Sequence, residues 1–472
     1  MGKYKDLAKN TVYVSIGTIG SKIIGIIMLP LYTRWLSVEE FGTVDAITIY
    51  STLLLCLISM CISESIFVFP KNQPNTIQGC YYSSGIAFCL LQFVLGFVLV
   101  LLINFISNFI KPQSIFISYS WFIYLLLVSS LIQAYTQSFT RSLNKMLVYS
   151  TMGIIQTICI SLFSFILIPK LGVRGYVFAF IIANLISSVF AFIVAKHRNY
   201  FSLKRIEKKY IKSMLKYSIP LIPNNIMWWL INGFNRPIME IYLSLFSLGI
   251  YAVANKFSTI LQSVFSIFGM SWFNSALDEY GKPGFEKFYN NCIKMISTFL
   301  FLSAYIIIIL SEKLVQFLTT EDYYIAYKYI PFLLLSIVFS CLSGVIGCIF
   351  ACVKKSVYYF YSSFFGGISS LLSLFLLTPI YGLYGVALSV LISHTLMLFF
   401  TMRFSFKYVE VKNLKHYIFL LLIYFSISLN TLFENQYSDF VNILSFSLFI
   451  LISKKDIAAL IGLIKLHFLN KI

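Results

Sequence analysis

The chain has 472 residues, of which 59% are hydrophobic and only 11% are charged, and its mean hydropathy is +0.85. A soluble domain covers itself with polar side chains, so this composition excludes a soluble globular protein. The net charge of +19 would suit a nucleic-acid-binding protein. The basic residues, however, are concentrated in short connections between apolar runs, which argues against that function.

Apolar runs of about 18–25 residues, the length of a helix that crosses a bilayer, recur along the whole chain. We therefore predict an all-α polytopic membrane protein with about fourteen transmembrane helices. The first run is too long for the core of a signal peptide and has no small-residue cleavage site after it, so we expect it to be retained. The expected helices cover residues 11–33, 43–69, 78–105, 116–138, 147–168, 174–195, 213–235, 242–270, 288–310, 327–352, 356–377, 383–402, 414–432 and 437–453.

The basic residues are distributed unequally between the two sides that these helices define. Segments on the side of the N-terminus carry 27 of the 36 lysines and arginines, and the opposite side carries 7. Such an excess is typical of the cytoplasmic side, so we predict that both termini are cytoplasmic. The positive charge then faces an anionic lipid surface, and we expect no nucleic-acid partner.

Nine cysteines lie mostly inside apolar runs, without C-x-x-C spacing or histidine partners. This pattern is typical of small buried side chains rather than of a disulfide framework or a metal site. We expect no metal and no cofactor.

Two sequence segments recur at nearly the same offset. PKLGVRG at 169–175 returns as PIYGLYG at 379–385, a shift of 210, and LSVEEFG at 36–42 returns as LSLFSLG at 243–249, a shift of 207. This indicates two six-helix lobes in the same orientation, related by an axis along the membrane normal. The expected organisation is an N-terminal lobe (1–195), a basic cytoplasmic linker (196–212), a C-terminal lobe (213–404), helices 13 and 14 (405–453) and an amphipathic cytoplasmic tail (454–472).

Two further segments complete a family resemblance. LKYSIPLIPN at 215–224 and LGIYAVANK at 248–256, together with the two repeated segments, resemble the motifs of bacterial polysaccharide flippases of the Wzx type. These belong to the multidrug/oligosaccharidyl-lipid/polysaccharide exporter superfamily. The resemblance covers essentially the whole chain in the right order.

The resemblance implies a transporter and not an enzyme. Its members move undecaprenyl-diphosphate-linked oligosaccharide repeat units across the bacterial inner membrane for O-antigen or capsule assembly. They work by alternating access, and coupling to an ion gradient is expected. Polymerisation follows in other proteins, so polysaccharide polymerase machinery is an expected partner besides the lipid-linked oligosaccharide and the bilayer.

Such a cargo needs cations for its diphosphate, because an anion cannot cross hydrocarbon unaccompanied. Lys22 and Lys256 lie near the middle of the first and eighth expected helices, and isolated charges at that depth usually face a protein interior or water. We expect both to line a cavity and hold the diphosphate, with an ion pair to a helix carboxylate as the alternative. Arg34 and Arg236, near outer helix ends, are candidates for the cavity mouth or ordinary interface anchors.

Two acids on the second expected helix are candidates for ion coupling. Glu64 lies inside its cytoplasmic end and Asp45 near its outer end. A carboxyl group in a low dielectric can keep a proton near neutral pH, so either could couple transport to a proton or sodium gradient. A salt bridge between Glu64 and Lys22 is the alternative.

The seventh expected helix carries unusually many polar and aromatic residues. Pro220 and Pro223 are expected to kink its first turns. Amides and indoles suit hydrogen bonding and stacking with sugars, whereas amide-mediated helix packing is the alternative. The candidate sugar-contacting residues are Asn224, Asn225, Trp228, Trp229 and Asn232.

Three other function classes fit the sequence less well. A membrane-bound polymerase or ligase needs a large external loop with catalytic groups, and the longest external connection, about 311–326, has no room for one. A multidrug exporter of the same superfamily usually has twelve helices and an acidic cavity. A peptidoglycan-precursor flippase has fourteen helices and a basic cavity, but more cavity arginines than occur here.

Overall fold

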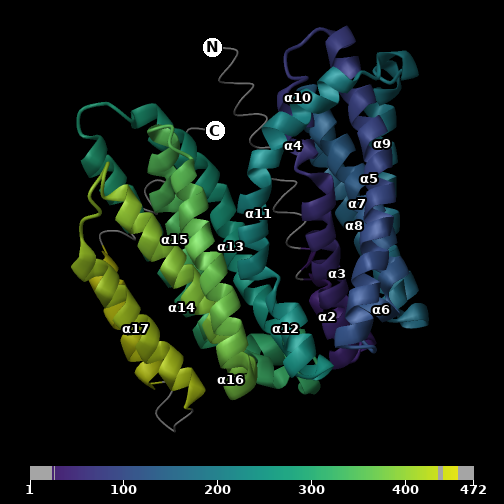
Figure 1. The fold of residues 1–472 in the computed structure, drawn as a ribbon. Coiled ribbons are helices and arrows are strands. Elements are labelled where there is room, and N and C mark those ends of the chain that lie inside the picture. The colour runs from purple at the N-terminus through teal and green to yellow at the C-terminus, as the bar shows by residue number, and fades with distance from the viewer. Residues whose placement is uncertain (1–23, 26, 434–439, 455–472) are drawn as a thin grey trace. The chain divides into compact units, whose positions relative to one another are not determined.

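The computed structural model describes residues 24–25, 27–433 and 440–454, and all regular secondary structure in this part is helical (Figure 1). The predicted all-α fold is confirmed. The amphipathic tail and most of the first expected helix, including Lys22, lie outside the described residues. The first helices are α2 (Leu29–Trp35), α3 (Val38–Ser59), α4 (Ile62–Val68), α5 (Asn75–Ile110), α6 (Ile115–Ser118), α7 (Ser120–Ser142), α8 (Met146–Leu171) and α9 (Val173–Val194).

The later helices begin with short elements in the basic linker. They are η1 (His197–Asn199), η2 (Leu203–Arg205), α10 (Lys208–Ser218), η3 (Ile219–Leu221), α11 (Ile222–Asn232), α12 (Asn235–Tyr242), α13 (Leu245–Glu279), α14 (Phe285–Leu318), η4 (Glu321–Tyr329), α15 (Ile330–Cys352), α16 (Val357–Ser405) and α17 (Leu414–Leu432). A shorter apolar helix follows at Phe440–Lys454.

Nine helices among the described residues are long and apolar enough to cross a membrane. The difference from fourteen has physical causes. α16 contains two expected spans, since Gly382 interrupts it with non-helical backbone angles. The seventh span is divided among α10, α11 and α12, with the 3-10 turn η3 at Pro220, where a kink was expected. Each expected span from the second to the fourteenth contains helix.

The described chain forms two compact units. The first contains the residues up to Trp229 and the segment Arg236–Gly249, and the second contains Leu230–Asn235 and the residues from Ile250. The two units are groups of residues that contact one another. The expected six-helix lobes are defined differently, by the sequence repeat.

Within each unit the connections alternate between two ends. In the first unit the connections after α4, α7 and α9 share one end, where the Lys145 ammonium donates a 2.5 Å hydrogen bond to the carbonyl of Ala195. In the second unit the connections before α14 and after α16 share one end, where Lys412 pairs with Glu286 at 2.7 Å. We call these the basic ends of the two units, because most of the lysines and arginines lie there.

The repeated Pro-x-x-Gly segments adopt the same local structure. Gly172 has φ 54° and ψ −129°, and Gly382 has φ 56° and ψ −130°. An L-residue is strained in this conformation because its Cβ meets the backbone, so both positions require glycine. Each glycine makes the transition between two long apolar helices, which supports a common local origin for the two segments.

Replacing Gly382 tests this backbone requirement directly. A Cβ on Gly382 would meet no atom within 4 Å, so any effect of Gly382→Ala comes from backbone strain alone. We expect Gly382→Ala to destabilise the protein by about 1–3 kcal/mol, measured by thermal unfolding in detergent. Gly153→Ala, a control with equally open space in the middle of α8, should be neutral or slightly stabilising. Equal effects of the two substitutions would contradict the requirement.

A fully buried histidine fastens the basic end of the first unit. His197 is 0% exposed; its Nδ1 lies 3.3 Å from the hydroxyl of Tyr82, and its Nε2 lies 3.1 Å from the hydroxyl of Thr140. Burial, with a smaller contribution from the charge of Lys145, lowers the pKa of His197 to about 4. The connection after α9 is therefore held to α5 and α7 by a neutral imidazole.

The stability of this attachment should depend on pH. In the unfolded chain His197 takes up a proton near pH 6.5, whereas in the folded chain it does so only near pH 4. Its contribution is therefore fully present above pH 6.5 and is lost, by up to about 3 kcal/mol, as the pH falls toward 4. We expect His197→Gln to unfold with a smaller pH dependence than the wild type between pH 4 and 6.5. Identical pH dependences would contradict this assignment.

Candidate functional site

The second expected helix is broken in the first unit. Met60 and Cys61 have φ of 46° and 54°, a left-handed conformation that is uncommon outside glycine, and they separate α3 from α4. The break frees backbone groups, which must be satisfied where water is absent. The side-chain amide of Gln92 donates to the carbonyl of Ser59 at 3.0 Å, and Tyr135 donates to the Gln92 carbonyl oxygen at 2.9 Å.

Glu64 lies directly after this break. It is in the first turn of α4, its side chain is exposed, and its backbone N–H donates to the carbonyl of Cys61 at 3.1 Å. Interrupted helices are where membrane transporters commonly place substrate and ion sites, because the interruption brings unusual polar groups to membrane depth. The structure thus puts the candidate coupling acid beside a strained and hydrogen-bonded helix break.

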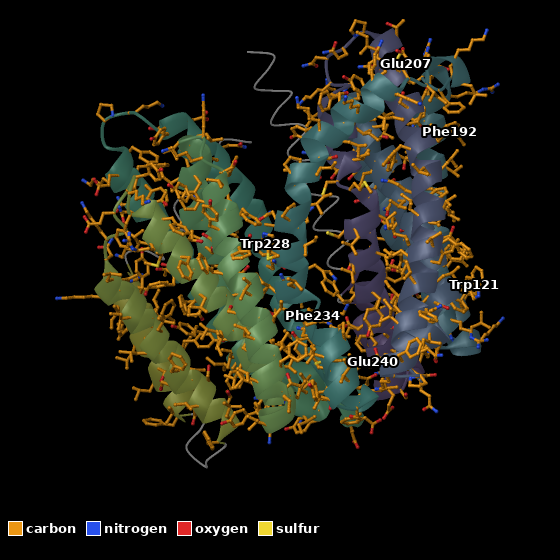
Figure 2. All side chains as sticks on the ribbon, viewed as in Figure 1. Trp121, Phe192, Glu207, Trp228, Phe234 and Glu240 are labelled. Carbon is orange, nitrogen blue, oxygen red and sulfur yellow. The ribbon has the colours of Figure 1, made fainter. Side chains whose placement is uncertain are left out.

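α11 contacts this broken helix through two of the five candidate sugar-contacting residues. The Asn225 amide donates to the Cys61 sulfur at 3.2 Å, and the Trp229 indole N–H lies 3.4 Å from the carbonyl of Ile49. These contacts are the helix packing considered as the alternative role. Trp228 is 36% exposed and lies on α11 in Figure 2, and Asn232 is also exposed, whereas Asn224 is half-buried.

The structure brings together Arg236 and Asp45, which were expected to have separate roles. The Arg236 guanidinium donates to the Asp45 carboxylate at 2.8 Å, joining α12 to α3. The Arg236 side chain is 2% exposed and that of Asp45 18%. Inside a membrane protein such a pair fixes two helices together, because separating the charges leaves them poorly solvated.

Glu240, one turn after Arg236, extends this polar cluster and was not predicted. It is 4% exposed and lies on α12 (Figure 2). Its carboxylate accepts a hydrogen bond from the hydroxyl of Tyr50 and another, at 2.6 Å, from the backbone N–H of Ile115. Lys111 donates to the Glu240 backbone carbonyl. The cluster therefore ties α12 to α3 and to the segment between α5 and α7.

The sequence placed Glu240 in an external connection, since the seventh helix was expected to end at 235. In the structure α12 continues to Tyr242. The i, i+4 spacing of Arg236 and Glu240 on an extended helix is the signal that would have placed both on one face.

The repeated LS-FG and LS-LG segments meet beside this cluster. Ser37 begins α3, and its hydroxyl accepts from the backbone N–H of Glu40 in a capping box. Ser244 accepts in the same way from the N–H of Ser247 near the start of α13. A Cβ on Gly42 would lie 2.5 Å from the backbone nitrogen of Gly249, so only glycine allows the two helix starts to approach this closely.

Two of the remaining candidates for diphosphate contact lie on helices other than α3 and α12. Arg34 is exposed in the last turn of α2. Lys256 is half-buried on α13, in the part that belongs to the second unit. Their roles, and that of Lys22, remain predictions.

The sequence matches two known protein families. Residues 7–273, more than half of the chain, match a family described as polysaccharide biosynthesis protein. The chain belongs to this family. Residues 220–377 also match the MatE family. No curated protein sequence matches the chain.

Several solved structures share the fold. One is the lipid II flippase MurJ in an inward closed conformation, with a TM-score of 0.74 and 20% identity over 94% of this chain and all of that chain. Another is an inward-facing multidrug resistance MATE family transporter of the MOP superfamily, with a TM-score of 0.66 and 12% identity over 83% of this chain and 97% of that chain. The outward-facing conformation of such a transporter matches with a TM-score of 0.54. The family and fold matches support the predicted superfamily.

Removing one partner of the ion pair between Arg236 and Asp45 should destabilise the protein. Arg236→Met leaves the Asp45 carboxylate without this partner, and we expect a loss of about 3 kcal/mol, measured as thermal unfolding in detergent. The double variant Asp45→Leu/Arg236→Met removes both charges and should recover most of the loss. Arg34→Met, which removes an exposed arginine, serves as the control. If the double variant is no more stable than Arg236→Met, the pair is not the source of the effect.

Proposed function

We propose that the protein is a flippase that moves undecaprenyl-diphosphate-linked oligosaccharide repeat units across the bacterial inner membrane for surface polysaccharide assembly. The observation that carries the proposal is the combination of two matches. The family is described by polysaccharide biosynthesis, and the fold agrees over 94% of the chain with a flippase for a lipid-linked precursor.

The chemistry of such a cargo agrees with the polar residues of this chain. The isoprenoid tail can stay in lipid, whereas the diphosphate and sugars need a polar route. In this proposal Lys22 and Lys256 hold the diphosphate, and Arg34 lies toward the cavity mouth. Arg236 acts at the same end through its ion pair with Asp45.

The helix break supplies the proposed coupling and sugar-binding region. Glu64 on α4 is the candidate for ion coupling, because it is exposed beside unwound backbone, whereas Asp45 is half-buried in an ion pair. Trp228 is the stronger candidate for sugar stacking, since its indole is partly exposed, whereas Asn225 contacts Cys61 at the helix break and Trp229 contacts α3. Asn224 and Asn232 complete the proposed sugar-contacting set.

The proposed orientation places the basic ends of both units in the cytoplasm. Cytoplasmic connections are enriched in lysine and arginine, and the linker 196–212 with its continuation to Lys216 carries eight of them. The cluster of Asp45, Arg236 and Glu240 then lies toward the external side.

A multidrug exporter is the second candidate, favoured by the MatE match over residues 220–377. Two observations favour the flippase. The MATE structure covers 83% of this chain and the MurJ structure 94%. A cation such as Lys256 within a long helix also suits an anionic cargo better than a cationic drug.

Deleting the gene tests the function. We expect loss of surface polysaccharide and accumulation of single undecaprenyl-linked repeat units on the cytoplasmic face, measured by extraction of lipid-linked sugars. Normal polysaccharide together with increased drug sensitivity would favour the exporter instead. Accumulation of a peptidoglycan precursor would favour a peptidoglycan-precursor flippase.

Complementation with point variants tests the residues. Each cation that holds the diphosphate contributes a charge-assisted interaction of about 1.5–3 kcal/mol, so Lys22→Ala and Lys256→Ala should each lower export about tenfold or more. Lys282→Ala is the control, because Lys282 is exposed in the connection before α14 and pairs with Glu279. All variants should be present in the membrane in equal amounts. Full export by both lysine variants would refute the assignment of the diphosphate site.

A further inference from the structure

A polar cavity lies at the basic end of the second unit, where the connection after α16 meets α14. Its volume is about 720 Å³. Three lysines line it, Lys294 from α14 and Lys412 and Lys415 from the connection and the first turns of α17, together with His416. Among the described residues that line it, Glu410 is the only acid, so this described lining carries a net positive charge.

One face of α14 builds this cavity with residues spaced four apart. Glu286 pairs with Lys412 at 2.7 Å. One turn on, the Asn290 side chain donates to the carbonyl of Glu410 at 2.9 Å and accepts from the backbone N–H of Lys412 at 2.7 Å. Lys294 comes next and lines the cavity. The connection is therefore fixed to the helix by an ion pair and by two hydrogen bonds between the Asn290 side chain and the backbone of the connection.

The fourth residue of this face positions the histidine. Thr298 lies one turn after Lys294, and its hydroxyl is 3.1 Å from Nε2 of His416. Because the connection and the histidine are both held by α14, the cavity is a preformed site and not a gap beside a loose loop.

An apolar groove adjoins the polar cavity. Its volume is about 300 Å³, and α14, α15, α16 and α17 line it with side chains that are almost entirely hydrocarbon. Val411 and Leu414 line both the cavity and the groove, while Ile293 lines the groove next to Lys294 in the cavity.

The groove is open on one side, where several of its lining side chains are exposed. Leu414 is 53% exposed, Ile418 56% and Phe399 57%. These side chains belong to helices long enough to cross the membrane, so the opening faces lipid tails. A cationic cavity that continues into a lipid-facing apolar groove matches an amphipathic molecule with an anionic head.

We propose that this cavity and groove form a binding site for an anionic membrane phospholipid. The phosphodiester and its net negative charge occupy the cavity between Lys294, Lys415 and His416, and one acyl chain lies in the groove. The bound lipid attaches α17, which lies outside the six-helix repeat, to α14. The inference does not rest on the proposed transport function.

Lipid binding to the purified full-length protein in detergent tests the site by native mass spectrometry. The probes are dioleoyl phosphatidylglycerol, dioleoyl phosphatidylcholine and glycerol phosphate. Because lysines near a membrane surface attract anionic lipids, Lys294→Gln/Lys415→Gln should weaken phosphatidylglycerol binding at least tenfold. Phosphatidylcholine should bind at least tenfold more weakly than phosphatidylglycerol to the wild type, and glycerol phosphate should not displace the lipid.

The matched control is Lys282→Gln/Lys287→Gln, which removes the same charge from exposed positions outside the cavity. It should bind phosphatidylglycerol like the wild type. Lys415→Gln alone changes an exposed position and should fold normally, so weaker phosphatidylglycerol binding by this variant cannot come from misfolding. Thr395→Trp places a large ring at an exposed position on the groove and should weaken binding of the lipid through its acyl chain.

Three outcomes would overturn the proposal. The first is equal binding of phosphatidylglycerol and phosphatidylcholine. The second is equal binding of phosphatidylglycerol by the cavity variants and the control variant. The third is displacement of the lipid by glycerol phosphate at similar concentration, which would identify a site for soluble anions instead.

Discussion

Inside a bilayer no water is available to satisfy backbone N–H and C=O groups, and each group left without a partner costs several kcal/mol. This constraint explains why the described chain is built from helices and where those helices can stop. At the break after α3, the side-chain amide of Gln92 donates a hydrogen bond to the carbonyl of Ser59, and the Tyr135 hydroxyl donates one to Gln92. Polar side chains are therefore required wherever the backbone is irregular, because they satisfy the backbone groups that the helix leaves unpaired.

The sequence was sufficient for the all-helical fold and for the positions of most apolar spans, because the bilayer imposes a length that apolar runs must match. The ends of helices were less predictable, since they depend on tertiary partners. The seventh span was expected to stop at Asn235, yet α12 continues because Arg236 and Glu240 find partners on other helices. The irregularity expected at Pro220 is present as the 3-10 turn η3, because proline acts on the backbone locally, without a tertiary partner.

The candidate site was predictable in its residue types and not in its pairings. Arg236 and Asp45 were each noticed as unusual charges in apolar surroundings, but 190 residues of chain separate them, and no local pattern indicates such a contact. Asn225 and Trp229 were expected to face sugars, but the Asn225 amide donates to Cys61 at the helix break and the Trp229 indole N–H to Ile49 on α3. Periodicity identifies a polar helix face, whereas only the neighbouring helix determines what that face contacts.

The matching glycine conformations at Gly172 and Gly382 have a consequence for ancestry. If the two segments descend from one duplicated gene, the ancestor worked as a pair of identical subunits, and every substitution appeared in both. Fusion allowed the copies to diverge. At the same offset of 210, Asn184 bonds to Gln156 on the neighbouring helix, whereas His394 bonds to Val390 on its own helix. A single chain can therefore adapt one half to its cargo while the other keeps the ancestral packing, which a homodimer cannot do.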